Sequence, residues 1–251
     1  MKVEWNYSSL ARPYLNRPDY APRGIDRMLG IAGVTAGAMA CDIGAGVGHL
    51  TIPLLERGLT VDAVEPNDAM RALGAERTAG YPAVSWYEGV GEATGRPDHA
   101  FDLITFGSSF NVTDRPKALS ETARIGKAEA WFACMWNHRD LDDPLQVEVE
   151  ALIRSHIPNY DYGVRREDQT AVIDRSGLFG GVTLIEEPVR HRVTVEDWID
   201  AWRSHATLAR QAGDRHGAIV DAIGSLLLNR GLSEINVPYT TRIWIAPLRT
   251  A

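Results

Sequence analysis

Cysteine and lysine are both scarce in this chain of 251 residues. Its two cysteines, Cys41 and Cys134, each lie inside an apolar run that predicts a buried strand, so we interpret them as small core residues. Their spacing matches no disulfide or metal-binding pattern, and we expect no metal site. Only three of the 26 basic residues are lysines, and the formal net charge is −7. This balance argues against nucleic acid as a general partner, because phosphate binding needs a basic face.

The chain also lacks a long hydrophobic run. No apolar stretch approaches the ~20 residues that a membrane helix needs. Residues 1–20 are polar and aromatic, without the basic and then apolar pattern of a secretory signal. We therefore expect a cytoplasmic protein with no membrane partner. A content of 45% hydrophobic residues is sufficient for one domain with a substantial core.

Apolar runs alternate with helical patterns through the first half of the chain, with strands predicted at 38–43, 61–64, 84–87, 101–106 and 131–136. This alternation predicts an α/β fold in which helices cover both faces of a mostly parallel sheet. The second half contains long helical stretches at 144–156, 196–210 and 216–230, and two further strands at 182–187 and 242–246. The sequence thus predicts a seven-stranded sheet with a helical cap over its carboxyl edge.

The strongest single signal is the glycine-rich segment that ends the first strand. It contains Asp42, Gly44, Gly46 and Gly48 immediately before a predicted helix. Glycine permits positive φ and close approach of a ligand to the main chain, and the helix N-terminus offers unpaired N–H groups. The dinucleotide fingerprint Gly-x-Gly-x-x-Gly fails, because its third position is His49. Taken alone, the segment indicates either a nucleotide cofactor or a plain tight turn.

A second element lies about twenty residues further along the chain. The strand at 61–64 ends in Glu65 and Pro66, and a carboxylate at such a strand end can accept both hydroxyls of a ribose. Met70 follows at the start of a helix, where its thioether can cover an adenine face. Each has a plainer alternative: Glu65 as a solvated strand end and Met70 as core filler. In this order, the two elements predict a nucleoside ligand.

These motifs, followed by Phe101-Asp102-Leu103-Ile104, resemble the class I S-adenosylmethionine-dependent methyltransferases over residues 7–248. The resemblance implies a Rossmann-like fold, S-adenosylmethionine as the cofactor and methyl transfer as the activity. One branch of the family is also similar in the arm at 17–20 and in the segments 109–111, 136–140 and 237–242. Within that branch the chain resembles natural-product tailoring enzymes of actinomycetes, in particular the lincosamide-type N-methyltransferases of antibiotic biosynthesis.

The resemblance also implies roles for individual residues. Asp42 and the glycines would border the methionine and ribose parts of the cofactor, and Glu65 would bind the ribose hydroxyls. Val90 stands where the family often has an acidic residue, so main-chain groups or Glu92 would contact the adenine amine. The cofactor site predicted in this way comprises Arg17, Asp42, Gly44, Gly46, Gly48, Glu65, Pro66, Met70, Val90, Gly91, Glu92 and Phe106.

Aromatic residues are better candidates than histidines for the part of the site that binds the methyl acceptor. Tyr7 and Tyr14 are seven residues apart and would share a helix face, and Phe110 follows the fourth predicted strand. We predict that these three rings wall the methyl-transfer channel, with an aromatic clamp for the arm as the alternative. The sequence offers no firm general base. His205, on a predicted cap helix, is the best catalytic candidate among the histidines.

Three interpretations of function stay open. The first is N-methylation of a small-molecule secondary metabolite. The second is O-methylation of a hydroxyl or carboxylate, which would use a base or an arginine-lined pocket. The third, a non-catalytic protein with the cofactor fold, is opposed by the intact glycine and Glu65 motifs. The arginine candidates for the second interpretation are Arg165, Arg166, Arg190 and Arg192.

We expect a single domain over residues 1–251. It divides into an N-terminal arm (1–24), a cofactor-binding core (25–140), a segment with the cap insertions (141–240) and the last strand (241–251). Trp5 and the apolar helix at 219–228 are available for a contact between identical subunits in a homo-oligomer.

Overall fold

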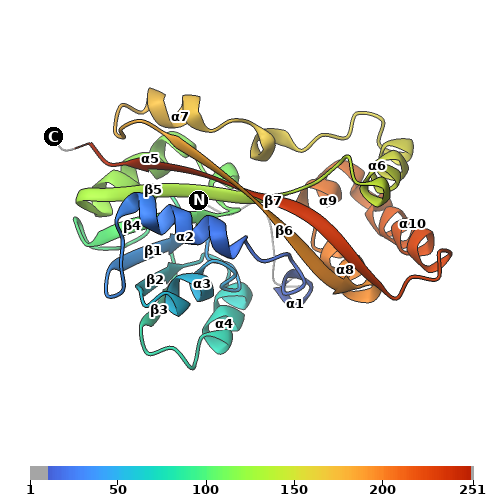
Figure 1. The fold of residues 1–251 in the computed structure, drawn as a ribbon, viewed down its shortest axis with the longest axis horizontal. Coiled ribbons are helices and arrows are strands. Elements are labelled where there is room, and N and C mark those ends of the chain that lie inside the picture. The colour runs from blue at the N-terminus through green and yellow to red at the C-terminus, as the bar shows by residue number, and fades with distance from the viewer. Residues whose placement is uncertain (1–10, 250–251) are drawn as a thin grey trace.

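The computed structural model describes residues 11–249 of the chain (Figure 1). Seven strands form one sheet in the order β3-β2-β1-β4-β5-β7-β6. Neighbouring strands are parallel except at β7, which is antiparallel to both β5 and β6. The predicted seven-stranded, mostly parallel sheet is therefore confirmed. The strands are β1 (Met39–Ile43), β2 (Thr60–Val64), β3 (Val84–Tyr87), β4 (Phe101–Gly107), β5 (Gly126–Arg139), β6 (Thr183–Thr194) and β7 (Glu234–Pro247).

Helices pack on both faces of the sheet, because alternate residues of a strand point to opposite sides. In β5, Ala133 and Met135 join the core under α2 (Pro22–Ala32) and α3 (Thr51–Glu56). Their neighbours Phe132 and Cys134 join the core on the opposite face, under α5 (Arg115–Ile125) and α7 (Thr170–Arg175). Helix α4 (Asp68–Arg77) lies beside the edge strand β3.

Both cysteines fit this arrangement as core residues. Cys41 and Cys134 are free thiols with fully buried side chains, and burial raises the pKa of each thiol well above its ordinary value. The prediction that they are small core residues is confirmed. None of the helices in residues 11–249 combines the length and the apolar composition that crossing a bilayer requires.

The last three strands run beyond the sheet's main core and carry a helical cap (Figure 1). The cap has its own apolar core, in which Trp198 and Trp202 of α8 pack with Ile223 of α10 and Val237 of β7. Helix α10 buries most of its apolar residues inside this core, whereas Leu228 at its end is 63% exposed. The cap helices are α6 (Pro144–His156), α8 (Val195–Arg203), α9 (Ala206–Ala212) and α10 (His216–Leu228).

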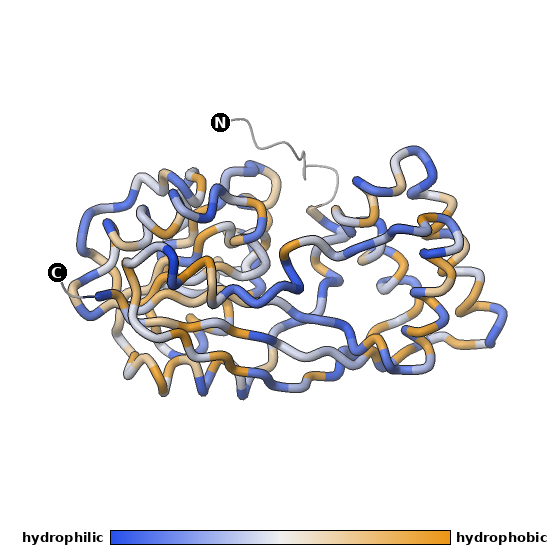
Figure 2. Tube along the Cα trace, turned by 90° about the horizontal axis from the view of Figure 1, so that it is seen from above, coloured by the Kyte–Doolittle hydropathy of each residue, from blue (hydrophilic) through white to orange (hydrophobic). Residues whose placement is uncertain are grey.

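The long strands differ from the sequence prediction in their extent. Strand β7 begins at Glu234, although we expected the last strand to start at 241, and β6 continues to Thr194. The two pair along their whole shared length, from Thr183 opposite Ile245 to Thr194 opposite Glu234. Between the main core and the cap these strands are hydrophilic (Figure 2), so an apolar pattern alone ends each strand too early.

A turn also interrupts the predicted helix at 196–210. Helix α8 ends at Arg203 and α9 begins at Ala206. The side chain of His205 accepts a hydrogen bond from the backbone N–H of Leu208, so His205 is the N-cap of α9. This break turns the chain at the position where the cap faces the carboxyl ends of the strands.

Candidate active site

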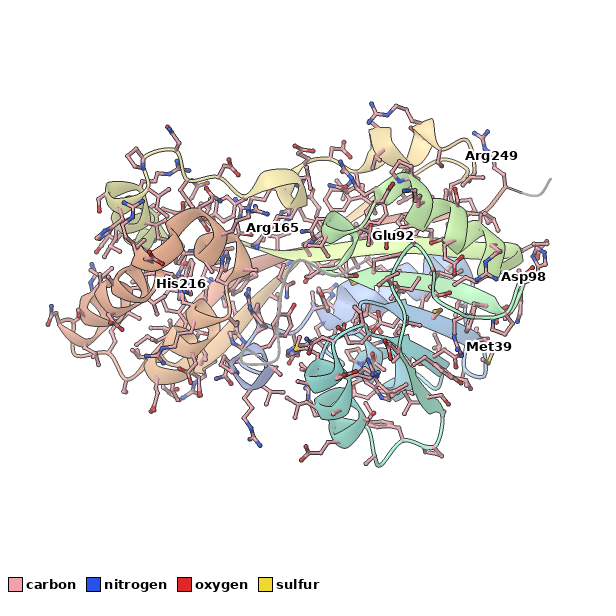
Figure 3. All side chains as sticks on the ribbon, turned by 180° about the vertical axis from the view of Figure 1, so that it is seen from behind. Met39, Glu92, Asp98, Arg165, His216 and Arg249 are labelled. Carbon is pink, nitrogen blue, oxygen red and sulfur yellow. The ribbon has the colours of Figure 1, made fainter. Side chains whose placement is uncertain are left out.

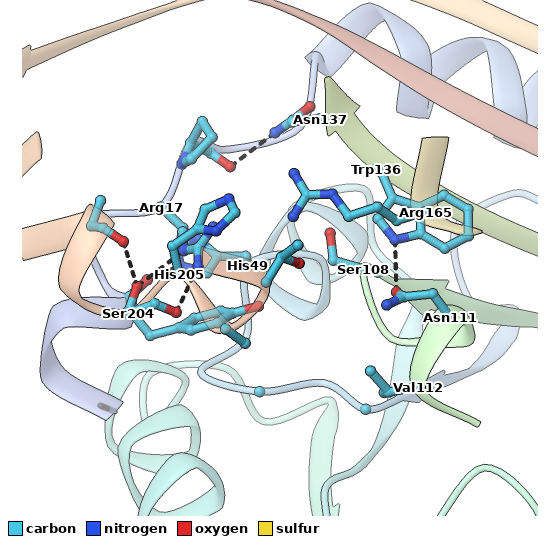
Figure 4. A pocket seen from close by; sticks show the side chains of 18 of the residues that line it. Arg17, His49, Ser108, Asn111, Val112, Trp136, Asn137, Arg165, Ser204 and His205 are labelled. Atoms are coloured by element: carbon cyan, nitrogen blue, oxygen red, sulfur yellow. Dashed lines mark hydrogen bonds between the residues drawn. The ribbon is translucent and has the colours of Figure 1, made fainter. Parts of the chain in front are cut away.

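A cavity of about 210 Å³ lies between the carboxyl ends of β1 and β4, the N-terminal arm and the cap (Figure 4). It brings together residues from segments far apart in the sequence. The predicted site residues that line it are Tyr14, Arg17, Asp42, Gly44, Gly46 and His205. The glycine loop and the helical cap therefore line one shared cavity.

The glycines of the loop after β1 all adopt conformations that favour glycine. Gly44, Gly46 and Gly48 have φ values of 67°, 59° and 89°. A Cβ on Gly44 would lie 2.4 Å from the Cβ of Ser109, which belongs to the turn after β4. The N–H of Gly44 donates to the carbonyl of Val64 at 2.8 Å, so the loop is closed against the end of β2.

Asp42 holds this loop from below. Its fully buried carboxyl group accepts hydrogen bonds from Thr51 Oγ1 at 2.7 Å and Thr105 Oγ1 at 3.1 Å. Burial raises the pKa of Asp42 to about 6, against the lowering effect of the two hydroxyls. Asp42 thus connects β1, α3 and β4 directly beneath the cavity.

Glu65 holds the same loop from the side. One carboxylate oxygen accepts from the N–H of Gly46 at 2.9 Å, and the other from the N–H of Asn67 at 2.9 Å. Burial raises the pKa of Glu65, and the backbone hydrogen bonds lower it. Each oxygen keeps a second lone pair, so the carboxylate can still accept from a ligand hydroxyl. Met70 is buried against Val47 of the loop and Ala11 of α1 (Ala11–Tyr14).

The segment expected to contact the adenine does not line the cavity. The backbone of Val90 forms a small bridge with Ala93, and a Cβ on Gly91 would lie 2.6 Å from the side chain of Thr113. The carboxylate of Glu92 accepts from the N–H of Asp114 at 2.6 Å, at the start of α5 (Figure 3). In the structure Glu92 therefore stabilises the start of α5.

Two predicted aromatic site residues are core residues instead. Phe106 and Phe110 are fully buried, with ring centroids 5.4 Å apart, and Phe110 also packs edge-on against Phe132 at 5.4 Å. Neither ring lines the cavity. The prediction that Phe110 walls the channel was wrong, because the short helix at 110–112 turns its first side chain into the apolar core. Asn111 and Val112, which follow it, face the cavity.

The N-terminal arm is fastened over the glycine loop by His49. Its Nε2 lies 3.0 Å from the carbonyl oxygen of Tyr14, and its Nδ1 lies 3.0 Å from a carboxylate oxygen of Asp19. Both ring nitrogens of His49 therefore contact the arm. Tyr14 lines the cavity, whereas Tyr7 lies outside the described residues.

His205 lines the cavity from the cap side, stacked on Trp202 with centroids 4.9 Å apart. Its Nδ1 accepts the N–H of Leu208 at 3.1 Å, so its proton must be on Nε2. Burial, with the nearby charges of Arg17 and Arg165, lowers the pKa of His205 well below its ordinary value. His205 is thus a neutral hydrogen-bond donor toward the cavity.

Sequence analysis missed two polar residues on the sheet side of the cavity. The hydroxyls of Tyr20 and Ser108 lie 2.9 Å apart, and Ser108 has a positive φ of 58° without being glycine. Such a strained backbone is typical of functional sites. Its conformation is not readable from the sequence, but its position just after β4, next to the switch point of the sheet, was an available signal.

Of the four arginines considered for an acceptor pocket, only Arg165 lines the cavity. Arg166 donates to the carbonyl oxygen of Arg139 at 2.6 Å, and Arg190 and Arg192 are exposed on β6. Arg139, which the sequence did not single out, also lines the cavity and stacks over the ring of Trp202. Its charge is balanced by Glu150 at 2.8 Å.

Comparison with known proteins agrees with this geometry. Residues 41–134, from β1 to β5, match the family described as the methyltransferase domain. An uncharacterized methyltransferase of Mycobacterium tuberculosis is 34% identical over 124 residues, which are 49% of this chain and 48% of that protein. The chain thus spans about half the length of the curated relatives that it matches.

Solved structures are similar over most of the chain. The YcgJ protein of Bacillus subtilis aligns with a TM-score of 0.59 and 19% identity, covering 92% of this chain and 100% of that one. Phosphoethanolamine N-methyltransferase 2 of Haemonchus contortus aligns with a TM-score of 0.56 and 16% identity, covering 96% and 57%. At these identities the likeness concerns the fold. Residues 41–134 are therefore similar to a methyltransferase domain, and the fold of the chain resembles that of the two solved structures.

Proposed function

We propose that this protein transfers a methyl group from S-adenosylmethionine to a small molecule held between the sheet and the cap. The observation that carries the proposal is the shared cavity, which Asp42 and Gly46 line at one end and Trp202 and His205 at the other. A reaction of this kind depends on orienting two bound molecules and limiting the access of water, and a cavity between the sheet and the cap serves both needs.

The glycine loop fits the cofactor. Gly44 and Gly46 line the cavity with main chain alone, and Glu65 retains free lone pairs for hydroxyl groups. We assign Asp42, Gly44, Gly46 and Gly48 to the methionine and ribose portions and Glu65 to the ribose. Pro66, Met70 and the segment Val90, Gly91 and Glu92, which lies outside the described cavity, form the adenine side in this proposal, with the buried Phe106 packed behind Gly91. When bound, the cofactor supplies a methyl group already activated by its sulfonium.

The acceptor atom must attack with an available lone pair, because the described residues around the cavity offer no ready base. The Nδ1 of His205 is occupied and its Nε2 carries the proton. Both ring nitrogens of His49 are bonded to the arm, and burial raises the pKa of Tyr20. A neutral amine needs no base, which favours N-methylation, in keeping with the resemblance to lincosamide-type enzymes of antibiotic biosynthesis.

A second candidate is O-methylation of a carboxylate. A carboxylate is already ionised near neutral pH and also needs no base. The specific observation in its favour is the set of arginines that line the cavity, Arg17, Arg139, Arg165 and Arg210. Hydroxyl methylation, by contrast, would call for the base that the described cavity residues do not supply.

The test is a transfer assay with radiolabelled S-adenosylmethionine against panels of amine and carboxylate acceptors. N-methyl products survive alkaline treatment, whereas methyl esters release labelled methanol. Label that stays in an alkali-stable product supports N-methylation, and label lost as methanol supports the carboxylate candidate. Cofactor binding without any transfer to either panel would contradict both.

A further inference from the structure

Arg165 places a positive charge on the wall of the cavity without an anionic partner. The residue lies in the short helix η2 (Gly163–Arg166), and its guanidinium points into the pocket (Figure 4). Its backbone is held by His138, whose Nε2 lies 2.9 Å from the Arg165 carbonyl oxygen. The Nε of Arg165 is buried and has no hydrogen-bond partner in the described structure. The side chain is therefore aimed into the cavity but unsatisfied there.

The guanidinium groups of Arg139, Arg17 and Arg166 each have at least one acceptor. Arg139 is bonded to Glu150 at 2.8 Å and to Gln146 at 2.6 Å. Arg17 donates to Ser204 through Nε and Nη2, and Arg166 donates to the carbonyl oxygen of Arg139. The ring of Tyr162, 5.5 Å from the Arg165 guanidinium carbon, gives that cation only a weak aromatic contact.

The charge on the cap side of the cavity is therefore positive. Burial, with the like charges of Arg17 and Arg139, lowers the pKa of Arg165 to about 10, so the group is still protonated at neutral pH. Asp42 is the one carboxylic acid among the described residues that line the cavity, and it is satisfied by Thr51 and Thr105. An unpaired cation in a buried position lowers the stability of the folded chain, and such positions often serve a ligand.

We infer that Arg165 anchors an oxyanion-binding subsite for the acceptor, which therefore carries a carboxylate or phosphate group. The planar guanidinium can donate two parallel hydrogen bonds to such a group. His205, a neutral donor on the same cavity wall, adds a second contact without adding charge. This inference rests on the proposed function and specifies its acceptor. An amine acceptor with an acidic group and a carboxylate acceptor both satisfy it.

The test uses inorganic phosphate as the probe. The full-length protein is first saturated with S-adenosylhomocysteine, so that the sites for the cofactor's own carboxylate are filled. Phosphate is then titrated calorimetrically, with sodium chloride at matched ionic strength as the reference. Arg165→Gln should weaken phosphate binding by about tenfold or more. Arg175→Gln, at the exposed end of α7, removes the same charge outside the cavity and should leave phosphate binding unchanged.

Three results would overturn the inference. Equal phosphate affinity in Arg165→Gln and wild type would remove the subsite. If Arg175→Gln weakened phosphate binding as much as Arg165→Gln, the effect would be due to the overall charge of the protein. A tenfold loss of S-adenosylhomocysteine affinity in Arg165→Gln would assign the residue to the cofactor. If the wild type binds no S-adenosylhomocysteine, the proposed function fails, and phosphate titration of the unliganded protein still decides the subsite.

Thermal unfolding gives a second, independent readout. Arg165→Gln should melt at a higher temperature than wild type without phosphate, because it removes an unpaired, partly buried charge. Added phosphate should then raise the melting temperature of wild type more than that of the variant. A lower melting temperature for Arg165→Gln without phosphate would show a structural role instead. If this variant does not fold, Arg165→Lys, which keeps the charge and loses the planar fork, should also bind phosphate more weakly than wild type.

Discussion

The guanidinium of Arg17 donates two hydrogen bonds to Ser204, from Nε to Oγ at 3.1 Å and from Nη2 to the carbonyl oxygen at 2.7 Å. Arg17 belongs to the arm after α1, and Ser204 belongs to the turn between α8 and α9. The contact joins the arm to the cap across 187 residues of sequence, beside the cavity that both residues line.

Breaking this contact should loosen the arm and the cap together. We expect Arg17→Ala to lower the free energy of unfolding by about 1–3 kcal/mol, the range for hydrogen bonds to a charged group. Ser204→Ala should cost less, because the bond to its carbonyl oxygen remains. A double-mutant cycle by urea denaturation measures the coupling, which should be about 0.5 kcal/mol or more. Strictly additive effects would argue against a connection between arm and cap.

Gly44 should tolerate no larger side chain. Its φ of 67° and the 2.4 Å approach to the Ser109 Cβ both penalise Gly44→Ala, for which we expect a loss of about 2–4 kcal/mol. Cofactor affinity should fall as well. Gly30→Ala is the matched control, because Gly30 lies in α2 with nothing near its Cβ position and should gain up to about 1 kcal/mol. Denaturation curves for the two variants should shift in opposite directions.

Asp42 should make stability depend on pH. Its folded-state pKa of about 6 lies above the ordinary value, so the folded chain binds this proton more tightly than the unfolded chain does. The contribution of Asp42 to stability is then greatest at low pH and falls as pH rises from about 4 to about 6. Relative to wild type, Asp42→Asn should gain stability across that window. Parallel melting curves of the two proteins between pH 4 and 7 would contradict the raised pKa.

Phe110 should matter for the core and little for the acceptor. Phe110→Leu leaves a gap beside Phe106 and Phe132, and we expect a loss of about 1–2 kcal/mol in unfolding free energy. Val112→Ala is the control two residues away, where the side chain is 63% exposed and the change should stay within about 0.5 kcal/mol. Unchanged stability in Phe110→Leu together with a raised KM for the acceptor would show that the Phe110 ring contacts the acceptor.

His205 should act as the N-cap of α9 and as a hydrogen-bond donor, and not as a general base. His205→Asn keeps a side-chain oxygen that can cap α9, whereas His205→Ala should lose about 1 kcal/mol of stability. Because the wild-type imidazole is neutral through the physiological range, kcat should show no inflection from it near pH 6 to 7. A pH profile with such an inflection, abolished in His205→Asn, would make His205 the base.

The sheet and the conformation of the glycine loop were predictable because local rules govern them. Gly44, Gly46 and Gly48 occupy left-handed turns that sequence already marks, and Glu65 ends a short apolar strand. These features depend on neighbours in the chain. The class of fold followed from the alternation of strands and helices in the first half.

The acceptor half of the cavity was less predictable because its contacts are long-range. Arg139 lies at the end of β5, beyond the apolar residues from which the strand was predicted. Ser108 has a positive φ that its residue type does not indicate. Phe110 shows the opposite error. From the sequence, an aromatic residue after the fourth strand can belong either to a substrate channel or to the core. The packing of Phe110 against Phe132 in the structure places it in the core.

Calorimetric titration with S-adenosylmethionine and S-adenosylhomocysteine tests the central claim most directly, with NAD as a control ligand and Glu65→Ala and Asp42→Ala as variants. The account predicts micromolar binding of both ligands by wild type, no binding of NAD, and a loss of affinity of at least about tenfold in each variant. Absence of binding by folded wild-type protein, or equal affinity in all three proteins, would contradict a cofactor site on this glycine loop.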